Sequence, residues 1–187
     1  MAGVATASVR RIARRAGISS GTLTHHFPSI DDLLTAVLRA EQTAFVERRG
    51  AMLARRASAL EGILGIGPHL FADDAAVREY WTLWLDHWAR SAHDTELARW
   101  QSDDYAAWRR LLADLISEGI AAGEFVAVDA ERVAAELVAF IDGLALQAFF
   151  RVDGFDPAAA QTMFRDAVRS WLPLPSGLRD PLVCREP

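Results

Sequence analysis

The 187-residue chain lacks several features that mark well-defined classes of protein. Its single cysteine, Cys184, cannot form an intramolecular disulfide, and no spacing of Cys and His predicts a zinc site. Its apolar runs, such as residues 143–150, are far shorter than the roughly 18 residues that a membrane-spanning helix needs. The N-terminus shows no signal-peptide pattern. We therefore expect a cytoplasmic protein that makes no membrane contact.

Acidic residues are missing from the first 27 positions, which hold four arginines: Arg10, Arg11, Arg14 and Arg15. The whole chain has a net charge of −5, so these 27 residues carry +4 and the remainder carries −9. Only the first segment has a charge suited to a polyanion such as DNA. A solvent-exposed helix face explains four arginines equally well, and charge alone does not separate the two interpretations.

What the chain does contain is a helical pattern. Apolar residues make up 51% of the sequence and recur with a helical period, and no stretch alternates as a β-strand would. The expected fold class is therefore all-α. Capping residues and helix breakers place the helices at residues 8–16, 20–27, 30–56, 60–71, 75–92, 103–122, 130–150 and 157–172. Four prolines predict a disordered tail at residues 173–187.

The first two helices have the spacing of a helix-turn-helix. Ala13 is small enough for two helices to cross closely, Gly17 permits the tight turn, and Leu23 anchors the second helix. The remaining inward positions are expected to be Ile12, Ala16 and Ile18. The outward positions of the second helix are Ser20, Gly21, Thr22, Thr24 and His25. Small and hydroxyl-bearing side chains there can enter the major groove of DNA, while the arginines, Arg10 among them, would contact the phosphate backbone.

Six tryptophans are present, and three of them, Trp81, Trp84 and Trp88, share one face of an expected helix. A buried core stripe explains this pattern, and so does a ligand pocket between helices. The candidate ligand-binding aromatic residues are Trp84, Trp88, Trp108, Phe140 and Phe149. Aromatic side chains arranged in this way would suit a quaternary ammonium group through cation–π attraction.

Asp142 interrupts the largely apolar helix at residues 130–150. Two roles are open for it: it caps or pairs at an interface, or it orients a polar or cationic ligand. A helix that is apolar on most faces must be covered. Residues of about 133–150 and 158–172 are therefore the expected surface of a homodimer, with Gly143 allowing a close approach of helices.

No arrangement of residues favours an enzyme. His25 and His26 are consecutive and so point to different sides of a helix, and a second group around His87 and His93 is loose. No nucleophile with a matched base and no glycine-rich phosphate loop is present. We therefore expect no catalytic residue, no metal site and no cofactor.

Residues 9–34 closely resemble the DNA-binding segment of the TetR family of transcriptional regulators; their sequence is VRRIARRAGISSGTLTHHFPSIDDLL. Two later segments look like the C-terminal domain of the branch that includes the choline-responsive repressor of betaine synthesis. They are REYWTLWLDHWARSAHDTELARWQ, residues 78–101, and VAAELVAFIDGLALQAFF, residues 133–150. The resemblance implies an all-α protein in which a helix-turn-helix head precedes a larger ligand-binding and dimerisation domain.

This resemblance also implies roles for single residues. The recognition helix would contain Ser20, Gly21, Thr22 and His25, and the positions near DNA phosphates would be Thr6 and Ser8. The sequence departs from the family at three places. Thr24 stands where members usually have tyrosine, Ile30 stands where they often have lysine, and the family's first helix would have to lie before Gly3.

Two functional hypotheses follow. In the first, the protein is a sequence-specific DNA-binding regulator, a repressor that binds a palindromic double-stranded operator as a homodimer and is released by a small-molecule effector of unknown identity. Its helix-turn-helix domain would be residues 1–46, without the family's first helix, and its ligand-binding and dimerisation domain residues 47–172. In the alternative, motivated by the missing first helix of the family and by the departures at Thr24 and Ile30, it is a dimeric all-α ligand-binding or interaction module that does not bind DNA.

Overall fold

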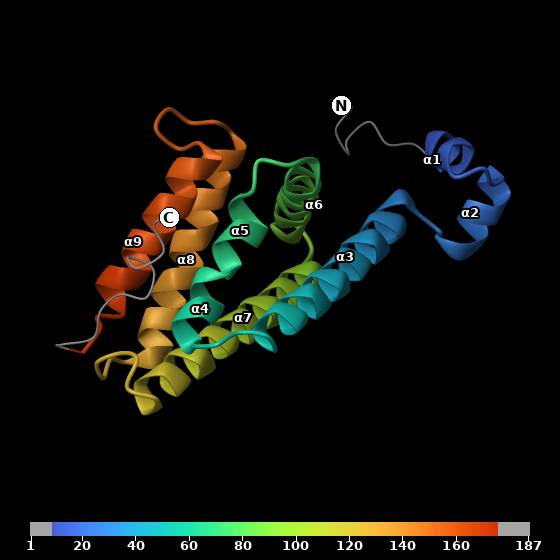
Figure 1. Ribbon diagram of the computed structural model, residues 1–187. Helices are drawn as coiled ribbons and strands as arrows, with labels where there is room; N and C mark the ends of the chain where they lie inside the picture. Colours follow the sequence, from blue (N-terminus) through green and yellow to red (C-terminus); the bar gives the residue numbers. More distant parts are fainter. Residues whose placement is uncertain (1–8, 176–187) are drawn as a thin grey trace.

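The computed structural model describes residues 9–175, and within this range it contains helices and no β-strand (Figure 1). The expected all-α fold class is confirmed. The helices are α1 (Val9–Arg15), α2 (Ser20–His26), α3 (Ile30–Leu53), α4 (Ala59–Leu64), α5 (Ile66–Phe71), α6 (Ala75–Ser91), α7 (Thr95–Ala121), α8 (Ala130–Phe149) and α9 (Pro157–Trp171). None of these helices is long and apolar enough to cross a membrane.

The first helices begin where the sequence predicts. Ser19 caps α2, because its hydroxyl oxygen accepts a hydrogen bond from the backbone N–H of Thr22 at 2.9 Å. Ser29 and Asp32 form a capping box at the start of α3: the Ser29 hydroxyl accepts from Asp32 N at 3.1 Å, and the Asp32 carboxylate accepts from Ser29 N at 3.0 Å. Gly17, with a φ of +71°, makes the turn between α1 and α2.

Two regions differ from the expected helices. Residues 60–71 form two short helices, α4 and α5, instead of one. Pro68 explains the break, because it has no N–H to donate and its ring conflicts with the carbonyl group of Leu64. Helix α7 begins at Thr95, about two turns before the expected start, because the Asp94 carboxylate accepts hydrogen bonds from the first free N–H groups of the helix at 2.8 and 3.0 Å.

Helix α3 joins two separate hydrophobic cores. The head, defined as α1, α2 and the first turn of α3, has a small core of Ala13, Leu23 and Leu33. The body, defined as the remaining described residues, has a much larger core to which α3 contributes Leu38 and Phe45. In Figure 1 the head stands at the far end of α3 from the body. The two cores thus divide within α3, between Leu33 and Leu38.

The core of the head is smaller than the sequence predicts. Ile12 packs against it, but Ile18 is 42% exposed and Ala16 is also exposed. The prediction that these two residues point inward is wrong. The contact between α1 and α2 is centred on Ala13 and Leu23, which leaves the turn between the helices at the surface.

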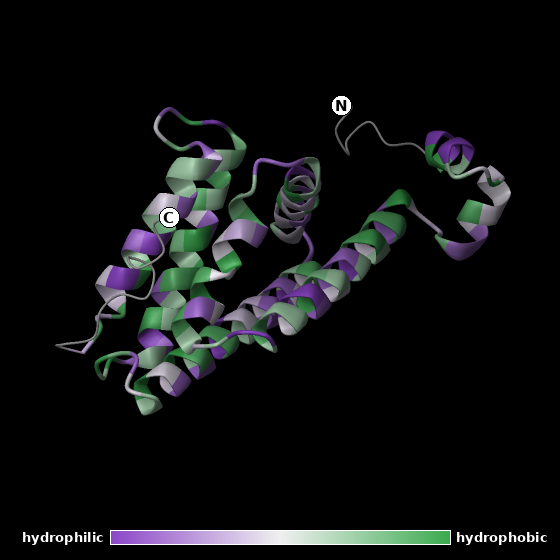
Figure 2. Cartoon of the chain, viewed as in Figure 1, coloured by the Kyte–Doolittle hydropathy of each residue, from purple (hydrophilic) through white to green (hydrophobic). Residues whose placement is uncertain are grey.

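Helix α8 lies at the centre of the body. It packs along α7 on one side and α9 on the other, and α4 and α5 close the remaining sides of the core. Ala134 and Leu137 have no exposed surface, and Figure 2 shows α8 as a largely hydrophobic helix. Each large apolar side chain buried in this way stabilises the fold by about 1.5–3 kcal/mol relative to an exposed one.

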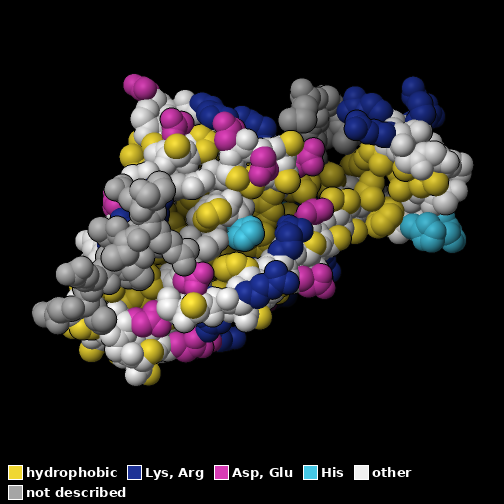
Figure 3. All heavy atoms as spheres, viewed as in Figure 1, with side chains coloured by type: hydrophobic (Ala, Val, Ile, Leu, Met, Phe, Trp, Pro, Cys, Tyr) yellow, Lys and Arg dark blue, Asp and Glu magenta, His cyan; other side chains and the backbone are white. Residues whose placement is uncertain are grey.

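An open groove separates α3 from α5 and α6. Its lining includes Phe45 and Met52 of α3, Tyr80 and Leu83 of α6, and Trp108 of α7, and its empty volume is about 1200 Å³ including the space open to solvent. Figure 3 shows apolar side chains in the hollow between α3 and the rest of the body. The middle of α3 is therefore only partly packed against the body.

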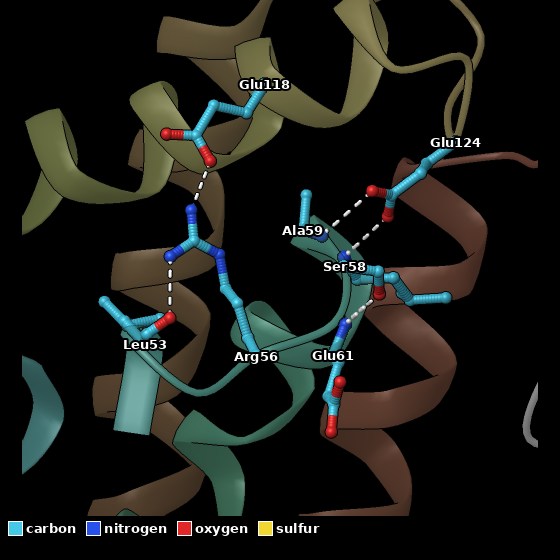
Figure 4. A network of polar contacts seen from close by, with 8 residues as sticks. Leu53, Arg56, Ser58, Ala59, Glu61, Glu118 and Glu124 are labelled. Atoms are coloured by element: carbon cyan, nitrogen blue, oxygen red, sulfur yellow. Dashed lines mark hydrogen bonds and ion pairs between the residues drawn. The ribbon is translucent and has the colours of Figure 1, made fainter. Parts of the chain in front are cut away.

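The end of α3 that is further from the head is fixed to the body by polar contacts (Figure 4). Arg56, just beyond α3, donates to the carbonyl oxygen of the last α3 residue at 2.8 Å and pairs with Glu118 of α7. The Glu124 carboxylate accepts hydrogen bonds from Ala59 N and Leu60 N, both at 3.0 Å, at the start of α4. These contacts anchor the connection from α3 to α4 against the end of α7.

Residues 173–175 continue from α9 along the body. The carbonyl oxygen of Pro173 accepts a hydrogen bond from Val126 N at 2.9 Å, and Leu174 packs against the body core. The ordered chain therefore extends past residue 173, where the disordered tail was expected to begin. The rest of that expected tail, residues 176–187, lies outside the described residues.

Replacing Gly119 with alanine is expected to destabilise the body. A Cβ at this position would collide with the Phe125 ring and lie 3.0 Å from the Cβ of Ala59, so α4 and α7 would have to move apart. We expect the free energy of unfolding, measured by urea denaturation, to fall by about 1–3 kcal/mol. The control is Gly50→Ala, where a Cβ meets no atom within 4 Å and the better helix propensity should add up to about 1 kcal/mol. Equal stability of the two variants would contradict this packing.

Candidate functional site

The head presents the outward side of α2 to solvent, as the helix-turn-helix prediction requires. The exposed or half-buried residues of this side are Ser20, Gly21, Thr22, Thr24 and His25. Leu23 is buried beneath them, and Arg10 is exposed on α1. Basic side chains gather on one side of the head in Figure 3. Thr6 and Ser8, expected near DNA phosphates, lie outside the described residues.

Two hydroxyl groups on this surface are bonded within the head. The hydroxyl oxygens of Thr22 and Ser19 lie 2.8 Å apart, and the Thr24 hydroxyl donates to the carbonyl oxygens of Ser20 and Gly21 at 3.1 and 3.2 Å. A hydroxyl that donates to its own helix has its one proton occupied. Thr24 therefore offers a partner its methyl group and the lone pairs of its oxygen.

A cavity lies in the body between α6, α7 and α8. The volume inside it is about 40 Å³, well below the roughly 300–1,000 Å³ of small-molecule pockets, so an organic ligand would enter only if the lining side chains moved apart. The lining residues are Leu70, Tyr80, Trp81, Trp84, Trp88, Gln101, Asp104, Tyr105, Trp108, Val138, Ile141 and Asp142. Half of them are aromatic. We call this cavity the cage.

The tryptophan rings that α6 contributes to the cage are tilted to one another. The centroids of Trp84 and Trp88 are 6.5 Å apart with an angle of 52° between the planes, and those of Trp81 and Trp88 are 6.1 Å apart at 58°. The Trp81 indole N–H donates to the carbonyl oxygen of Leu70 at 2.8 Å, which fixes that ring. Rings tilted in this way can present several π faces to one cation.

Two carboxylates belong to the cage wall. Asp142 of α8 accepts a hydrogen bond from the Tyr105 hydroxyl at 2.6 Å, and burial raises the pKa of this carboxyl group. Asp104 of α7 accepts a hydrogen bond from the side-chain amide of Gln42, and burial raises its pKa to about 6. Burying a carboxylate costs free energy, and a cation inside the cage would offset that cost.

Arg49 of α3 faces the same wall. Its guanidinium carbon lies 4.2 Å from the centroid of the Trp108 ring and 5.5 Å from that of Phe45. Burial lowers the pKa of the guanidinium, and the charge of Asp104 acts in the opposite direction. The wall of the cage thus combines two carboxylates with one nearby guanidinium.

His87 of α6 lies behind the aromatic wall and is fully buried. Its ring centroid is 4.6 Å from that of Trp100 and 5.5 Å from that of Trp84, and its Nε2 atom is 3.3 Å from the Ser91 hydroxyl. Burial, followed by the charge of Arg90, lowers the pKa of the imidazole, so the neutral form is favoured. His87 therefore acts here as a packing residue that supports the tryptophans.

Four of the six expected ligand-binding residues come together in the cage: Trp84, Trp88, Trp108 and Asp142. Phe140 and Phe149 do not line it. Phe140 packs edge-on against Trp171, with centroids 5.4 Å apart, and Phe149 lies under the Arg78 guanidinium at 5.1 Å. On α8, Phe140 is about 200° around the helix from Asp142, and Phe149 is about 10 Å further along it.

Sequence reasoning missed eight of the twelve residues that line the cage, and four of these eight carry a hydroxyl, amide or carboxyl group: Tyr80, Gln101, Asp104 and Tyr105. Three of these four, with Trp108, occupy the i, i+3, i+4 and i+7 positions of α7, which form a single helix face. The expected start of that helix near residue 103 left out its first turns, so this stripe was incomplete in the sequence pattern.

Comparison with protein families gives two matches that together cover most of the chain. Residues 59–173, which contain the cage, match the model described as "BetI-type transcriptional repressor, C-terminal". Residues 2–37, which contain α1 and α2, match the model described as "Bacterial regulatory proteins, tetR family". The second match favours a DNA-binding regulator over a module that does not bind DNA.

Individual relatives agree. The HTH-type transcriptional regulator BetI of Escherichia coli (strain K12) is 31% identical over 176 residues, which cover 91% of this chain and 86% of the relative. The BetI protein of Paraburkholderia phymatum is 32% identical over 170 residues, covering 89% and 83%. A transcriptional regulator from Saccharomonospora viridis, solved in complex with choline, is 27% identical with a TM-score of 0.84, covering 90% and 88%. The chain therefore belongs to the TetR family of transcriptional regulators and carries a BetI-type C-terminal domain.

Proposed function

We propose that this regulator is a repressor whose effector is a small organic cation with one quaternary ammonium group, the class that choline represents. Regulators of the TetR family bind operator DNA and small-molecule effectors, typically as dimers. The observation that carries the proposal is the cage, in which tilted tryptophan rings surround a space walled by Asp104 and Asp142. A quaternary ammonium has no N–H to donate, so aromatic faces and carboxylates are suitable partners for it.

The charges of the wall favour a ligand with a single positive charge. Asp104 and Asp142 carry up to two negative charges when ionised, and Arg49 carries one positive charge. A monocation would reduce the negative charge of this wall. A zwitterion such as glycine betaine would bring a third carboxylate into a wall where burial already disfavours two.

A hydroxyl group on the ligand also has a partner. The Gln101 side-chain oxygen, in the cage lining, is buried without a hydrogen bond of good geometry among the described residues, and its nearby polar side chain is the imidazole of His87. A buried acceptor left unpaired costs free energy, and a hydroxyl donor on the ligand would satisfy it. The structural relative from Saccharomonospora viridis, solved with choline, supports the same ligand class.

The dimer and the operator complete the proposal. We propose that two copies join through α8 and α9, at residues of about 133–150 and 158–172. Phe150, at the end of α8, is 63% exposed, and a Cβ built at Gly143 meets no atom within 4 Å. The residues that would enter the major groove are Ser20, Gly21, Thr22 and His25. The two heads would then read half-sites of a palindromic operator about 34 Å apart.

Choline is expected to bind the wild-type protein and to weaken its complex with the operator. The neutral compound 3,3-dimethylbutan-1-ol has the same shape, with carbon in place of the quaternary nitrogen, and should bind at least about tenfold more weakly because it lacks the charge. Isothermal titration calorimetry gives both dissociation constants, and fluorescence anisotropy of a labelled duplex from the adjacent promoter follows release. Equal affinities would contradict the cation–π account, and absence of choline binding would reject the effector class.

Choline affinity is expected to depend on pH through Asp104. Because the pKa of this carboxyl is about 6, it is ionised above about pH 7 and becomes protonated as the pH falls through 6. The affinity should therefore be nearly constant above about pH 7 and fall below about pH 6, by up to tenfold per pH unit. Calorimetry across this range measures the effect. In Asp104→Asn the affinity should be low throughout, and a steep fall near pH 6 in that variant would assign the titration to another group.

Removing the His25 side chain is expected to weaken operator binding. His25 is exposed on the outward side of α2, and loss of one good base contact lowers affinity by about 1–3 kcal/mol, or roughly 5- to 150-fold. Fluorescence anisotropy with the promoter duplex compares His25→Ala with Thr43→Ala. Thr43 is exposed on α3 and its hydroxyl donates to the carbonyl oxygen of Arg39 at 3.0 Å, so its loss should leave DNA binding unchanged. Unchanged affinity in His25→Ala would remove this residue from the proposed interface.

A further inference from the structure

One face of α3 contacts the wall of the cage. Gln42, Phe45 and Arg49 follow one another at i, i+3 and i+7, so they lie on the same side of the helix. Gln42 donates a hydrogen bond to the Asp104 carboxylate, and Phe45 stacks on Tyr80 with centroids 5.0 Å apart and an interplanar angle of 25°. The helix that carries the head therefore touches the same residues that line the ligand cavity.

Arg49 makes an unusual contact on this face. Its guanidinium lies against the rings of Trp108 and Phe45, yet its Nη1 atom is buried with no hydrogen-bond partner in the described chain. Burial lowers the pKa of the group, which means that the protein holds its charge at a cost, offset in part by the charge of Asp104. The guanidinium is thus held mainly by an aromatic ring and a nearby carboxylate.

These are the same interactions that the cage offers to a quaternary ammonium. Trp108 and Asp104 both line the cavity, and both interact with Arg49. We propose that Arg49 is an internal competitor of the effector: it interacts with Trp108 and Asp104, and a cation entering the cage displaces it. This inference rests on the proposed function, because it requires a cationic effector.

The competition follows from electrostatics and does not require the two cations to overlap. A ring that already polarises toward one cation attracts a second one less, and two positive charges sharing one carboxylate repel each other. Binding of the effector therefore disfavours the position that Arg49 holds, and Arg49 in that position disfavours the effector by the same free energy.

The groove between α3 and α6 offers the displaced side chain another position. Arg49 lines this groove, and so do Glu41 of α3 and Asp74 and Glu79 of α6. Glu41 and Glu79 are exposed, so a guanidinium beside them would regain hydration as well as carboxylate partners. Displacement from Trp108 thus moves a half-buried guanidinium, whose Nη1 atom has no hydrogen-bond partner among the described residues, to a more solvated position in the same groove.

A change at Arg49 would reach the head because of the way α3 is held. The far end of α3 is anchored through Arg56 and Glu118, and its first turns carry the head. Near the head, Arg90 of α6 donates to the Thr35 hydroxyl at 3.2 Å. Loss of the contact at Arg49 leaves the middle of α3 held by Gln42 and Phe45, and it weakens the attachment of the helix to α6 and α7. Arg49 is therefore a positioning residue, and it does not have to touch the effector.

The test compares Arg49→Gln with Arg48→Gln in the full-length chain, with choline as the probe. Arg48 is an exposed neighbour on the same helix and lines the groove, so its variant removes one positive charge without removing the ring contact. We expect Arg49→Gln to bind choline about three- to thirtyfold more tightly than wild type in calorimetry, and Arg48→Gln to bind within about twofold of wild type.

The second readout is coupling, defined as the ratio of operator dissociation constants with and without saturating choline. It should fall toward one in Arg49→Gln and remain at the wild-type value in Arg48→Gln. Arg49→Lys keeps the positive charge but loses the planar contact with the ring, so its choline affinity and its coupling ratio should both be intermediate. This variant replaces Arg49→Gln in the test if Arg49→Gln does not fold. Thermal unfolding checks that each variant is folded.

Different outcomes separate the two proposals. If wild type binds choline and Arg49→Gln binds it with equal or lower affinity, the internal competitor is refuted and the effector class stands. If Arg49→Gln binds choline more tightly but keeps the full coupling ratio, Arg49 is not the link to α3, and the inference is refuted in that respect. If neither protein binds choline, the proposed effector class fails, and the inference fails with it.

Discussion

The burial of two carboxylates among aromatic rings is the constraint on which the body depends. Asp104 and Asp142 enter the cage wall from two different helices, and in the described part of the chain Gln42 and Tyr105, respectively, stabilise them by hydrogen bonds. Aromatic rings exclude water but attract positive charge, so the same wall that makes these acids costly would favour a cation in the cavity, as we propose. A core built for stability alone would place apolar side chains at both positions.

Helix α3 connects the cage to the helix-turn-helix head. Its first turn completes the core of the head with Leu33, and its middle contacts the cage through Gln42 and Arg49. Helix α3 therefore packs at two sites at once, the core of the head and the wall of the cage. Because the head makes its own small core and stands at the end of α3, a displacement of that helix by a few ångströms would move the recognition helix as a unit. The groove beside α3 leaves room for such a displacement, which a close-packed contact would not.

Local signals in the sequence predicted most of the fold, and the misses have specific physical causes. The caps at Ser19 and Ser29 were predictable because a helix start leaves N–H groups that a nearby hydroxyl can satisfy. The sequence also contains the residues that cause the break before Pro68 and the early start of α7 at Asp94. The predicted helix boundaries followed the helical spacing of apolar residues and did not take account of these two signals. In the cage, the tryptophan stripe was visible, whereas the roles of Asp104 and Arg49 depend on which helices pack together, which no helical period determines.

A crystal structure of the protein with choline tests the central claim most directly. The account predicts the trimethylammonium group between the rings of Trp84, Trp88 and Trp108, within about 6 Å of their centroids, beside Asp104. It also predicts the Arg49 guanidinium displaced from its position in this structure, 4.2 Å from the centroid of the Trp108 ring. Choline bound elsewhere, with the cage empty, would contradict the account of the site. Choline in the cage with Arg49 still on Trp108 would contradict the link from the site to α3.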